Sequence, residues 1–375
     1  MCVLGKEEIV ESPKFRIILF SLSCIFAVGV TLTGCGGGGG GGDDGSTSVE
    51  PQPPLAIDVT NAMQATAAVL DATVLVVDVG GPGGPIGVVV DQESTQVDLL
   101  KVIRAQVNKF PVLTEQTAQL TGVVLPYEPF DCNVSGTVTF SGEIASPDSS
   151  SLTPGDTITI AATNCDDGDG LVLNGTMTLV VVTATGMIDQ DPYSVNLFLP
   201  PYDFTFDVTM GNFSIKETAT GSAATINGDL TWQEDSDDGV IINSMYSGNS
   251  LQLTSPDTTD ILTKYQITST IDQGNNDAYT TVNAGSLSST KLGGSVDFQT
   301  TTPFTGYNSD FPDTGQIVIT GATVTDGVGF SKVTAVSENS TCVRLVVDPN
   351  GDGLTSEIIT TWESLPTGVP VDCPI

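Results

Sequence analysis

Residues 204–210 read FTFDVTM, an alternation of apolar side chains with threonine hydroxyls and one carboxylate. Because successive side chains of a β-strand point to opposite faces, this period of two predicts a strand with one apolar and one polar face. Parallel strands that are covered by helices on both faces read instead as continuous apolar runs. The stretch therefore favours an antiparallel sheet with one face in water.

The same period of two recurs along most of the chain after Val134. Val138 and Phe140 alternate with threonine and serine, and Tyr265, Ile267 and Ile271 alternate with polar residues. Asn-Gly and Asp-Gly pairs, which are typical of tight hairpin turns, separate the alternating stretches. Further strands are predicted at residues 157–162, 171–183, 223–232, 240–246, 316–321, 329–336, 343–347 and 358–362.

Two segments before the strands have helical periodicity. In residues 60–77 and again in residues 94–110, apolar or small side chains recur every three or four positions, with Gly80-Gly81 and Pro111 as stop signals. Such stripes usually pack into a core. We therefore expect a mainly β fold, a large curved antiparallel sheet or open barrel with two N-terminal helices packed on it. The helical segment would be 55–125 and the antiparallel β domain 126–375.

The start of the chain resembles a bacterial lipoprotein signal peptide. Lys14 and Arg16 precede an apolar run, residues 17–30, that is short for a bilayer crossing. Leu32-Thr33-Gly34-Cys35 is similar to the lipobox at which such peptides are cut and acylated. The resemblance implies that residues 1–34 are removed and that Cys35 is acylated, with palmitate among its acyl chains. The alternative is an ordinary transmembrane anchor, which the short span disfavours.

A tether is expected after Cys35. The glycine run 36–42 and the Ser/Thr/Pro-rich stretch that follows it cannot bury apolar area, so residues 35–54 should be flexible. A lipidated cysteine before polyglycine is similar to many outer-membrane lipoproteins, and Gly36 is not the aspartate that retains such proteins at the inner membrane in enteric bacteria. We expect an outer-membrane protein, lipid-anchored on the periplasmic or the cell-surface face.

The net charge excludes one class of partner. The chain has 11 Lys and Arg, 45 Asp and Glu and no histidine. Residues 1–34 hold three charges of each sign, which leaves 8 basic and 42 acidic residues after them. Such a field repels nucleic acid phosphates and attracts divalent cations. We expect no nucleic acid partner, and the simplest interpretation of the acidity is solubility after export.

Four cysteines remain after Cys35, namely Cys132, Cys165, Cys342 and Cys373. An even number in an exported protein predicts disulfides, and three pairings are possible. Cys132 with Cys165 and Cys342 with Cys373 are near neighbours, and each of these bonds would contribute about 3 to 4 kcal/mol in the chain-entropy model. A zinc site is disfavoured because the chain has neither a CxxC spacing nor a histidine.

Several short patterns resemble a recurrent family of uncharacterised proteobacterial outer-membrane lipoproteins. They include residues 132–138 (CNVSGTV), 303–306 (PFTG), 350–353 (NGDG) and 360–362 (TTW). The resemblance covers most of the chain after the tether and implies an architecture but no activity. Members of the family end soon after the tryptophan, whereas this chain adds residues 366–375. That addition supports a Cys342–Cys373 bond as a local elaboration.

One loop has the spacing of a calcium site. Asp348, Asn350 and Asp352 occupy positions one, three and five, whose oxygens converge on the cation in a calcium loop. The glutamate expected at position twelve is replaced by Ile359, and Glu357 lies at position ten. The candidate metal ligands are therefore Asp348, Asn350, Asp352 and Glu357. A hairpin turn is the preferred interpretation, because Asn-Gly and Asp-Gly tolerate positive φ, although one loop can serve both roles.

The sequence lacks the residues of common catalytic sites. Without histidine, Ser-His-Asp and Cys-His nucleophile systems and histidine zinc sites are excluded, and no carboxylate pair stands out among so many acids. We therefore expect that the protein is not an enzyme and that its only candidate cofactor is calcium. We expect a binding or structural role with an unknown envelope or extracellular partner. The alternatives are a carrier of an apolar ligand or lipid in a pocket between helices and sheet, and a calcium-stabilised surface adhesion module.

Overall fold

The structure is a computed structural model that describes residues 52–74, 102, 103, 106, 123–126, 129–145, 151–189, 197–307, 311–324 and 329–374. The expected signal peptide, Cys35 and the tether up to residue 51 lie outside the described residues. The chain from Glu50 to Ile375 forms one compact unit.

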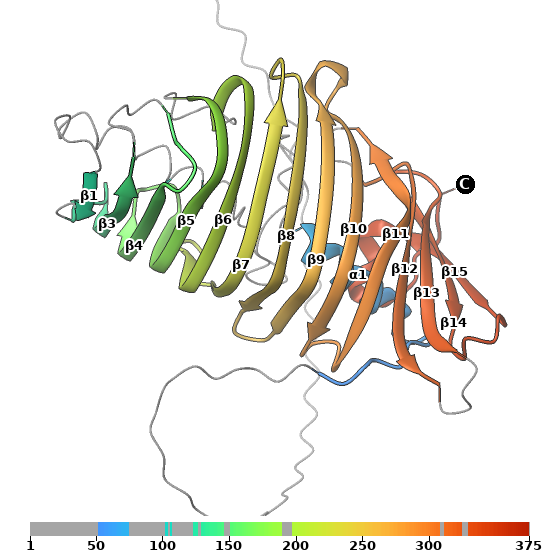
Figure 1. The fold of residues 1–375 in the computed structure, drawn as a ribbon. Coiled ribbons are helices and arrows are strands. Elements are labelled where there is room, and N and C mark those ends of the chain that lie inside the picture. Colours follow the sequence, from blue (N-terminus) through green and yellow to red (C-terminus); the bar gives the residue numbers. More distant parts are fainter. Residues whose placement is uncertain are drawn as a thin grey trace, which may run out of the picture. The chain divides into compact units, whose positions relative to one another are not determined.

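Fifteen strands form one antiparallel sheet, and from β3 onward each strand pairs with the next one in the sequence (Figure 1). β1 and β2 both pair with β3. The end strands β1 and β15 do not pair with each other, so the sheet is open, and the prediction of a mainly β fold is confirmed. The strands are β1 (Val123–Pro126), β2 (Phe130–Asp131), β3 (Ser135–Ile144), β4 (Thr157–Asp166), β5 (Leu171–Ile188), β6 (Phe198–Glu217), β7 (Ala223–Ser236), β8 (Ile241–Thr254), β9 (Thr259–Asp272), β10 (Ala278–Ser289), β11 (Gly294–Gly306), β12 (Thr314–Thr323), β13 (Phe330–Ser337), β14 (Cys342–Asp348) and β15 (Ser356–Thr361).

The alternation in residues 204–210 has the predicted effect in β6. Phe204 and Phe206 are buried, whereas Asp207 and Thr209 are exposed. The inner face of the sheet is defined here as the one that carries these phenylalanines, and the outer face as the one that carries Asp207 and Thr209. Burial alternates in the same way along β9, in which Tyr265, Ile267 and Ile271 are buried.

Asparagines in left-handed conformation interrupt the strand pairing at two similar points. Asn164 of β4 and Asn212 of β6 have φ of 47° and 49°, and the pairing register shifts beside each of them. Glycines of the neighbouring strands face them, since a Cβ on Gly136 would lie 1.9 Å from Asn164 O and one on Gly175 would lie 2.1 Å from Asn212 O. Such bulges bend a strand and increase its twist, which accounts for part of the curvature of the sheet.

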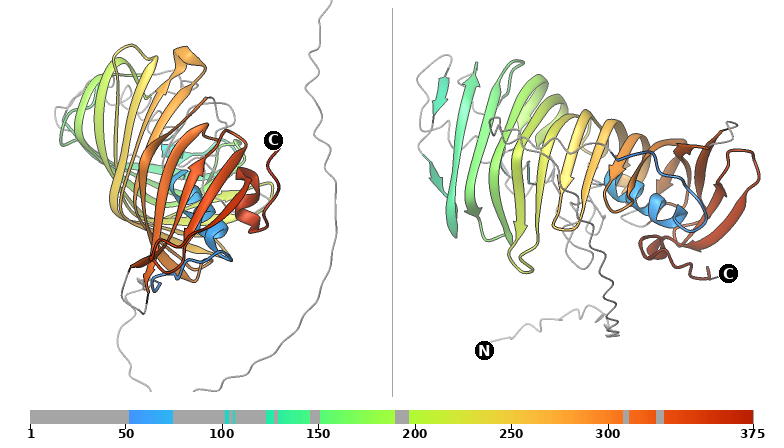
Figure 2. Two further views of the ribbon diagram at one scale, coloured as in Figure 1. Left: turned by 90° about the vertical axis from the view of Figure 1, so that its right-hand side faces the viewer. Right: turned by 90° about the horizontal axis from the view of Figure 1, so that it is seen from below.

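The first predicted helix is confirmed as α1, Ala62–Val74. The turn before it is held by Asp58, whose side chain accepts the backbone N–H of Thr60 at 2.7 Å and whose carbonyl accepts the N–H of Ala62 at 3.0 Å. Figure 2 shows that α1 lies on the concave side of the curved sheet, beside strands β9, β10, β13 and β14. The second predicted helix lies outside the described residues, except that Val102, Ile103 and Gln106 are helical and buried.

Two short 3₁₀-helices complete the described elements, η1 (Gln273–Asn275) and η2 (Trp362–Thr367). η2 follows β15 directly and packs beside α1. Within the described residues no helix combines the length and the apolarity that crossing a bilayer requires.

The last three residues of the expected tether, 52–54, and the chain that leads to α1 are bonded to the ends of four strands. We call residues 52–57 the entry segment. Its backbone forms hydrogen bonds of 2.7 to 3.0 Å with Ser288 of β10, Ser295 of β11, Ala322 of β12 and Ser331 of β13. These bonds and α1 join the start of the expected helical segment, 55–125, to the last third of the sheet.

Candidate functional site

The first disulfide fastens the N-terminal edge of the sheet. Cys132 follows β2 and bonds to Cys165 of β4, with the two Cα atoms 5.5 Å apart. Cys132 N–H also donates to Gly136 O of β3 at 3.0 Å. The bond therefore ties the outermost pairing of β2 with β3 to the next strand inward.

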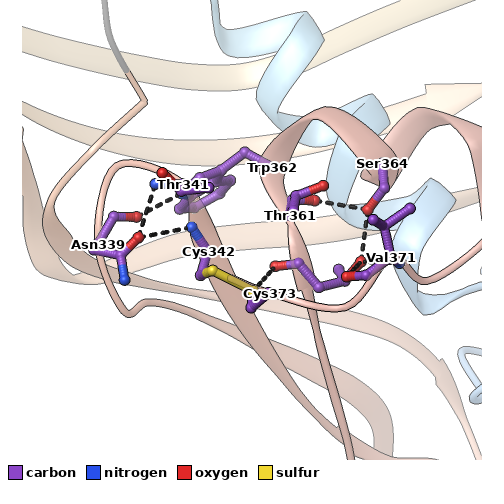
Figure 3. Close-up of a disulfide and its surroundings, with 9 residues drawn as sticks. Asn339, Thr341, Cys342, Thr361, Trp362, Ser364, Val371 and Cys373 are labelled. Atoms are coloured by element: carbon purple, nitrogen blue, oxygen red, sulfur yellow. Dashed lines mark hydrogen bonds between the residues drawn. A yellow bond between two sulfur atoms is a disulfide. The ribbon is translucent and has the colours of Figure 1, made fainter. Parts of the chain in front are cut away.

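The second disulfide fastens the opposite edge. Cys342 of β14 bonds to Cys373 of the C-terminal tail, with a Cα–Cα distance of 5.9 Å (Figure 3). Cys342 pairs across the strands with Thr361, the last residue of β15. The tail that follows β15 and η2 is thus tied back to the last strand but one. Both disulfides join the near neighbours among the four cysteines, which settles the pairing that the sequence left open.

Trp362 holds the chain where β15 passes into η2. Its indole Nε1 donates to Asn339 O at 3.0 Å, and its backbone N–H donates to Thr341 O at 3.1 Å (Figure 3). The indole is parallel to the ring of Phe311 at 5.8 Å and meets Phe304 edge-on at 6.4 Å. A single buried side chain at the start of η2 therefore contacts the β13–β14 turn, β11 and the connection after β11.

Thr360 fixes the tail beside β15. Its side chain is fully buried, its Oγ1 lies 2.6 Å from the hydroxyl of Ser364, and it accepts the backbone N–H of Val371 at 2.9 Å. Because Val371 is two residues before Cys373, this contact and the disulfide act on the same short segment.

The candidate calcium ligands lie along the β14–β15 hairpin, with Asp348 at the end of β14, Asn350 and Asp352 in the connecting loop and Glu357 in β15. Asp348 is buried, and its Oδ2 accepts the N–H of Gly353 at 3.1 Å and lies 3.4 Å from Lys332 Nζ. Asp352 is exposed and accepts the N–H of Leu354 at 2.8 Å. These bonds form the hairpin turn that is the preferred interpretation of the sequence. They do not test calcium binding, which stays a prediction.

Glu357 lies apart from the other candidate ligands. Its Oε1 is 3.5 Å from the guanidinium of Arg344, which also binds Glu338 at 2.6 Å. Within the residues described, a single group of three acidic or cysteine side chains brings its ligand atoms within 4.8 Å of one another, namely Cys132, Cys165 and Asp167. The carboxylates of Asp348, Asp352 and Glu357 thus do not converge. The two cysteines of that one group are in a disulfide and cannot act as thiolate ligands.

The outer face carries pairs of polar side chains from neighbouring strands. Such cross-strand pairs stabilise a sheet and keep one of its faces polar. Their donor–acceptor distances are 2.7 to 3.0 Å, and the pairs are Thr159 with Thr178, Asp207 with Thr231, Asp235 with Asn243, Asn243 with Thr270, and Thr305 with Thr314.

Two carboxyl groups meet where α1 faces β9. The pKa of Asp71 on α1 is raised to about 6, mainly by burial, against the opposing effect of Lys291 and with a smaller contribution from Asp260. Burial also raises the pKa of Asp260, although a hydrogen bond from Ser289 opposes that change. The Asp71 side chain remains exposed to solvent. Its charge is therefore disfavoured by the many protein atoms around it and not by complete burial.

Sequence reasoning missed the roles of Trp362, Thr360 and the Asp71–Asp260 pair. In the sequence, each of these residues is only an aromatic, hydroxyl or acidic side chain within a predicted strand or helix. Nothing else in the sequence marks it. Cys35, the expected lipidation site, lies outside the described residues. Comparison of the chain with protein-family models, with curated proteins and with solved structures finds no match.

Proposed function

We propose that this chain is a bacterial outer-membrane lipoprotein, held by lipid on Cys35, with a non-enzymatic binding or structural role in the cell envelope. The observation that carries the proposal is the pair of disulfides at the two edges of the sheet, because disulfides persist in exported proteins and are rare in the cytosol. Together with the lipobox-like sequence before Cys35, they favour export and anchoring.

The entry segment supports an anchored protein. It continues the expected tether directly into hydrogen bonds with β10, β11, β12 and β13. A body that is tethered at its N-terminus in this way would be held through four strands rather than through a loose end.

The outer face supports a binding role. Its paired threonine, asparagine and aspartate side chains offer many hydrogen-bond donors and acceptors over several strands. The large excess of acidic over basic residues makes a strongly anionic partner unfavourable. The partner class that fits is therefore a neutral or cationic envelope or extracellular molecule rich in hydrogen-bonding groups.

The apolar-ligand carrier is the less supported proposal. A carrier needs free space against the apolar side chains of its pocket. Phe204, Phe206 and Trp232 on the inner face are between 0% and 1% exposed, so protein atoms already cover them. The adhesion module is a variant of the binding role that depends on calcium.

Export and anchoring are tested by intact-mass spectrometry of the native protein from a bacterium with an outer membrane. We expect a chain that begins at an acylated Cys35, contains two disulfides and leaves the membrane fraction only with detergent. Cys35→Ser should abolish the lipid mass and the membrane association. Cys24→Ser, which changes a cysteine of the expected leader, is the matched control and should alter neither. An uncleaved chain in the cytosol with reduced thiols would refute the proposal.

A further inference from the structure

One oxygen of a buried carboxylate at the end of β14 has no hydrogen-bond partner among the described residues. The Asp348 side chain is 1% exposed. Its Oδ2 is engaged by Gly353 and Lys332, whereas its Oδ1 is buried and unpaired. A buried acceptor without a partner destabilises the fold, and more so when it is charged. A bound cation is the ligand that would satisfy it, because a carboxylate oxygen is an acceptor and not a donor.

The loop around this oxygen supplies further oxygens at the appropriate spacing. Gly353, whose N–H holds Oδ2, is the sixth residue counted from Asp348 and has a φ of +84°. A glycine at position six makes the sharp turn of a calcium loop, and positions three and five, here Asn350 and Asp352, supply its side-chain oxygens. The bond from Gly353 places the loop against the carboxylate.

We infer that this loop binds one calcium ion through Asp348 Oδ1, Asn350 and Asp352, and that Glu357 is not a ligand. Glu357 is excluded because its Oε1 lies 3.5 Å from the Arg344 guanidinium, which holds it in an ion pair on β15. Calcium accepts six to eight oxygens in flexible geometry, so backbone carbonyls and water complete its coordination. This inference does not rest on the lipid anchor, and either proposal can fail without the other.

Lys332 sets the strength of the site. Its ammonium group lies 3.4 Å from Asp348 Oδ2 and neutralises part of the charge that two carboxylates provide. Because affinity in such loops follows ligand charge, we expect a dissociation constant on the order of 10⁻⁴ to 10⁻³ M, as in extracellular calcium modules. Magnesium requires stricter octahedral geometry and should bind more weakly.

The site is tested on the full chain, stripped with chelator, by calorimetric titration with calcium chloride. One saturable site is expected. Asp352→Asn removes one ligand charge at an exposed position and should weaken binding by about tenfold or more. Glu357→Gln, and Asp169→Asn in a separate acidic turn, are matched controls with the same change in charge and should bind as the wild type does. Absence of a saturable site up to about 10 mM calcium, or an equal loss of affinity in Asp352→Asn and Asp169→Asn, would overturn the inference.

A second variant separates a calcium site from a turn without metal. Lys332→Met removes the cation that competes for Asp348 and should tighten calcium binding several-fold. It should also lower the melting temperature without calcium and recover it when calcium is added. If Lys332 only completes a turn, calcium will not restore the melting temperature, and that result contradicts the inference.

Discussion

A disulfide lies at each of the two edges of the sheet, but the non-covalent contacts that accompany it differ between the edges. At the N-terminal edge, Cys132–Cys165 supports strands that pair with β3 through their backbones. At the C-terminal edge, Cys342–Cys373 supports a tail that the Thr360 side chain of β15 holds, and the Trp362 side chain binds the turn between β13 and β14. Each disulfide therefore joins the segment at one end of the sheet to a strand inside that end.

This difference predicts which substitutions should destabilise each edge of the sheet. Backbone pairing at β2 does not depend on side-chain identity, so it should tolerate substitution. The C-terminal edge depends on a few buried side chains and on α1, which packs beside η2 and is present only at that end among the described elements. Substitutions at the C-terminal edge should therefore act locally and strongly.

Trp362→Ala should have the largest effect. It removes a ring that is 2% exposed, together with its hydrogen bond to Asn339, and large-to-small changes of this kind cost about 3 to 5 kcal/mol. Urea unfolding measures the loss, and hydrogen exchange should show that β15 loses protection first. Phe140→Ala, at a buried ring of β3, is the matched change at the other edge and should leave β15 protected. Equal loss of protection at both edges in either variant would contradict the comparison.

Replacing each disulfide by two serines should have the next largest effect. The cysteines are 33 and 31 residues apart, so chain entropy predicts similar losses of about 3 to 4 kcal/mol for the two bonds. The local consequences should differ, because β2 keeps its backbone pairing whereas the C-terminal tail keeps mainly the Thr360 contact. Limited proteolysis should therefore cut the tail in Cys342→Ser/Cys373→Ser well before it cuts near β2 in the other double variant. The reverse order would refute this explanation.

Asp71→Asn should have the smallest effect, and that effect should depend on pH. The pKa of Asp71 is about 6 in the fold against 3.8 in the unfolded chain, so the folded state holds its proton to higher pH. Stability from this group is fully present below about pH 4 and is lost as the pH rises through 6. Asp71→Asn should therefore stabilise the protein at pH 7 by about 1 kcal/mol, after allowance for solvent screening, and leave it unchanged at pH 3.5.

Asp238 gives a control of opposite sign. Backbone N–H groups of Ile241 and Val240 lower its pKa, so its contribution is present above pH 4 and is lost as the pH falls. Asp238→Asn should destabilise at pH 7 and have less effect in acid. Melting temperatures measured from pH 3.5 to 8 test both variants, and parallel curves for the two would count against the assignment.

Most of the sheet was predictable because its outer face is polar. In β6 and β9 the alternation is unbroken over several residues, and each was predicted as a strand. β10 and β11 were not among the predicted strands. In β10 the inner face carries the polar Asn283, and the pairing register shifts next to Gly285, so the period of two is broken in the middle of the strand. In β11 the register shifts twice near a run of threonines and a proline, which hides the pattern.

The site residues were less predictable because they depend on which strands lie at the edges. Cysteine spacing suggested the pairs, but the function of the bonds as edge fasteners requires the strand order. Spacing also included Glu357 among the candidate ligands, whereas its strand position places it against Arg344. The unpaired Oδ1 of Asp348 is a property of packing that no sequence pattern encodes.

The entry segment has a mechanical consequence. Its hydrogen bonds to Ser288, Ser295, Ala322 and Ser331 lie on four adjacent strands, so a pull on the N-terminus would load several bonds at once instead of peeling them one by one. Force on the N-terminus would then be distributed over the last third of the sheet, and detaching the entry segment would require its bonds to all four strands to break.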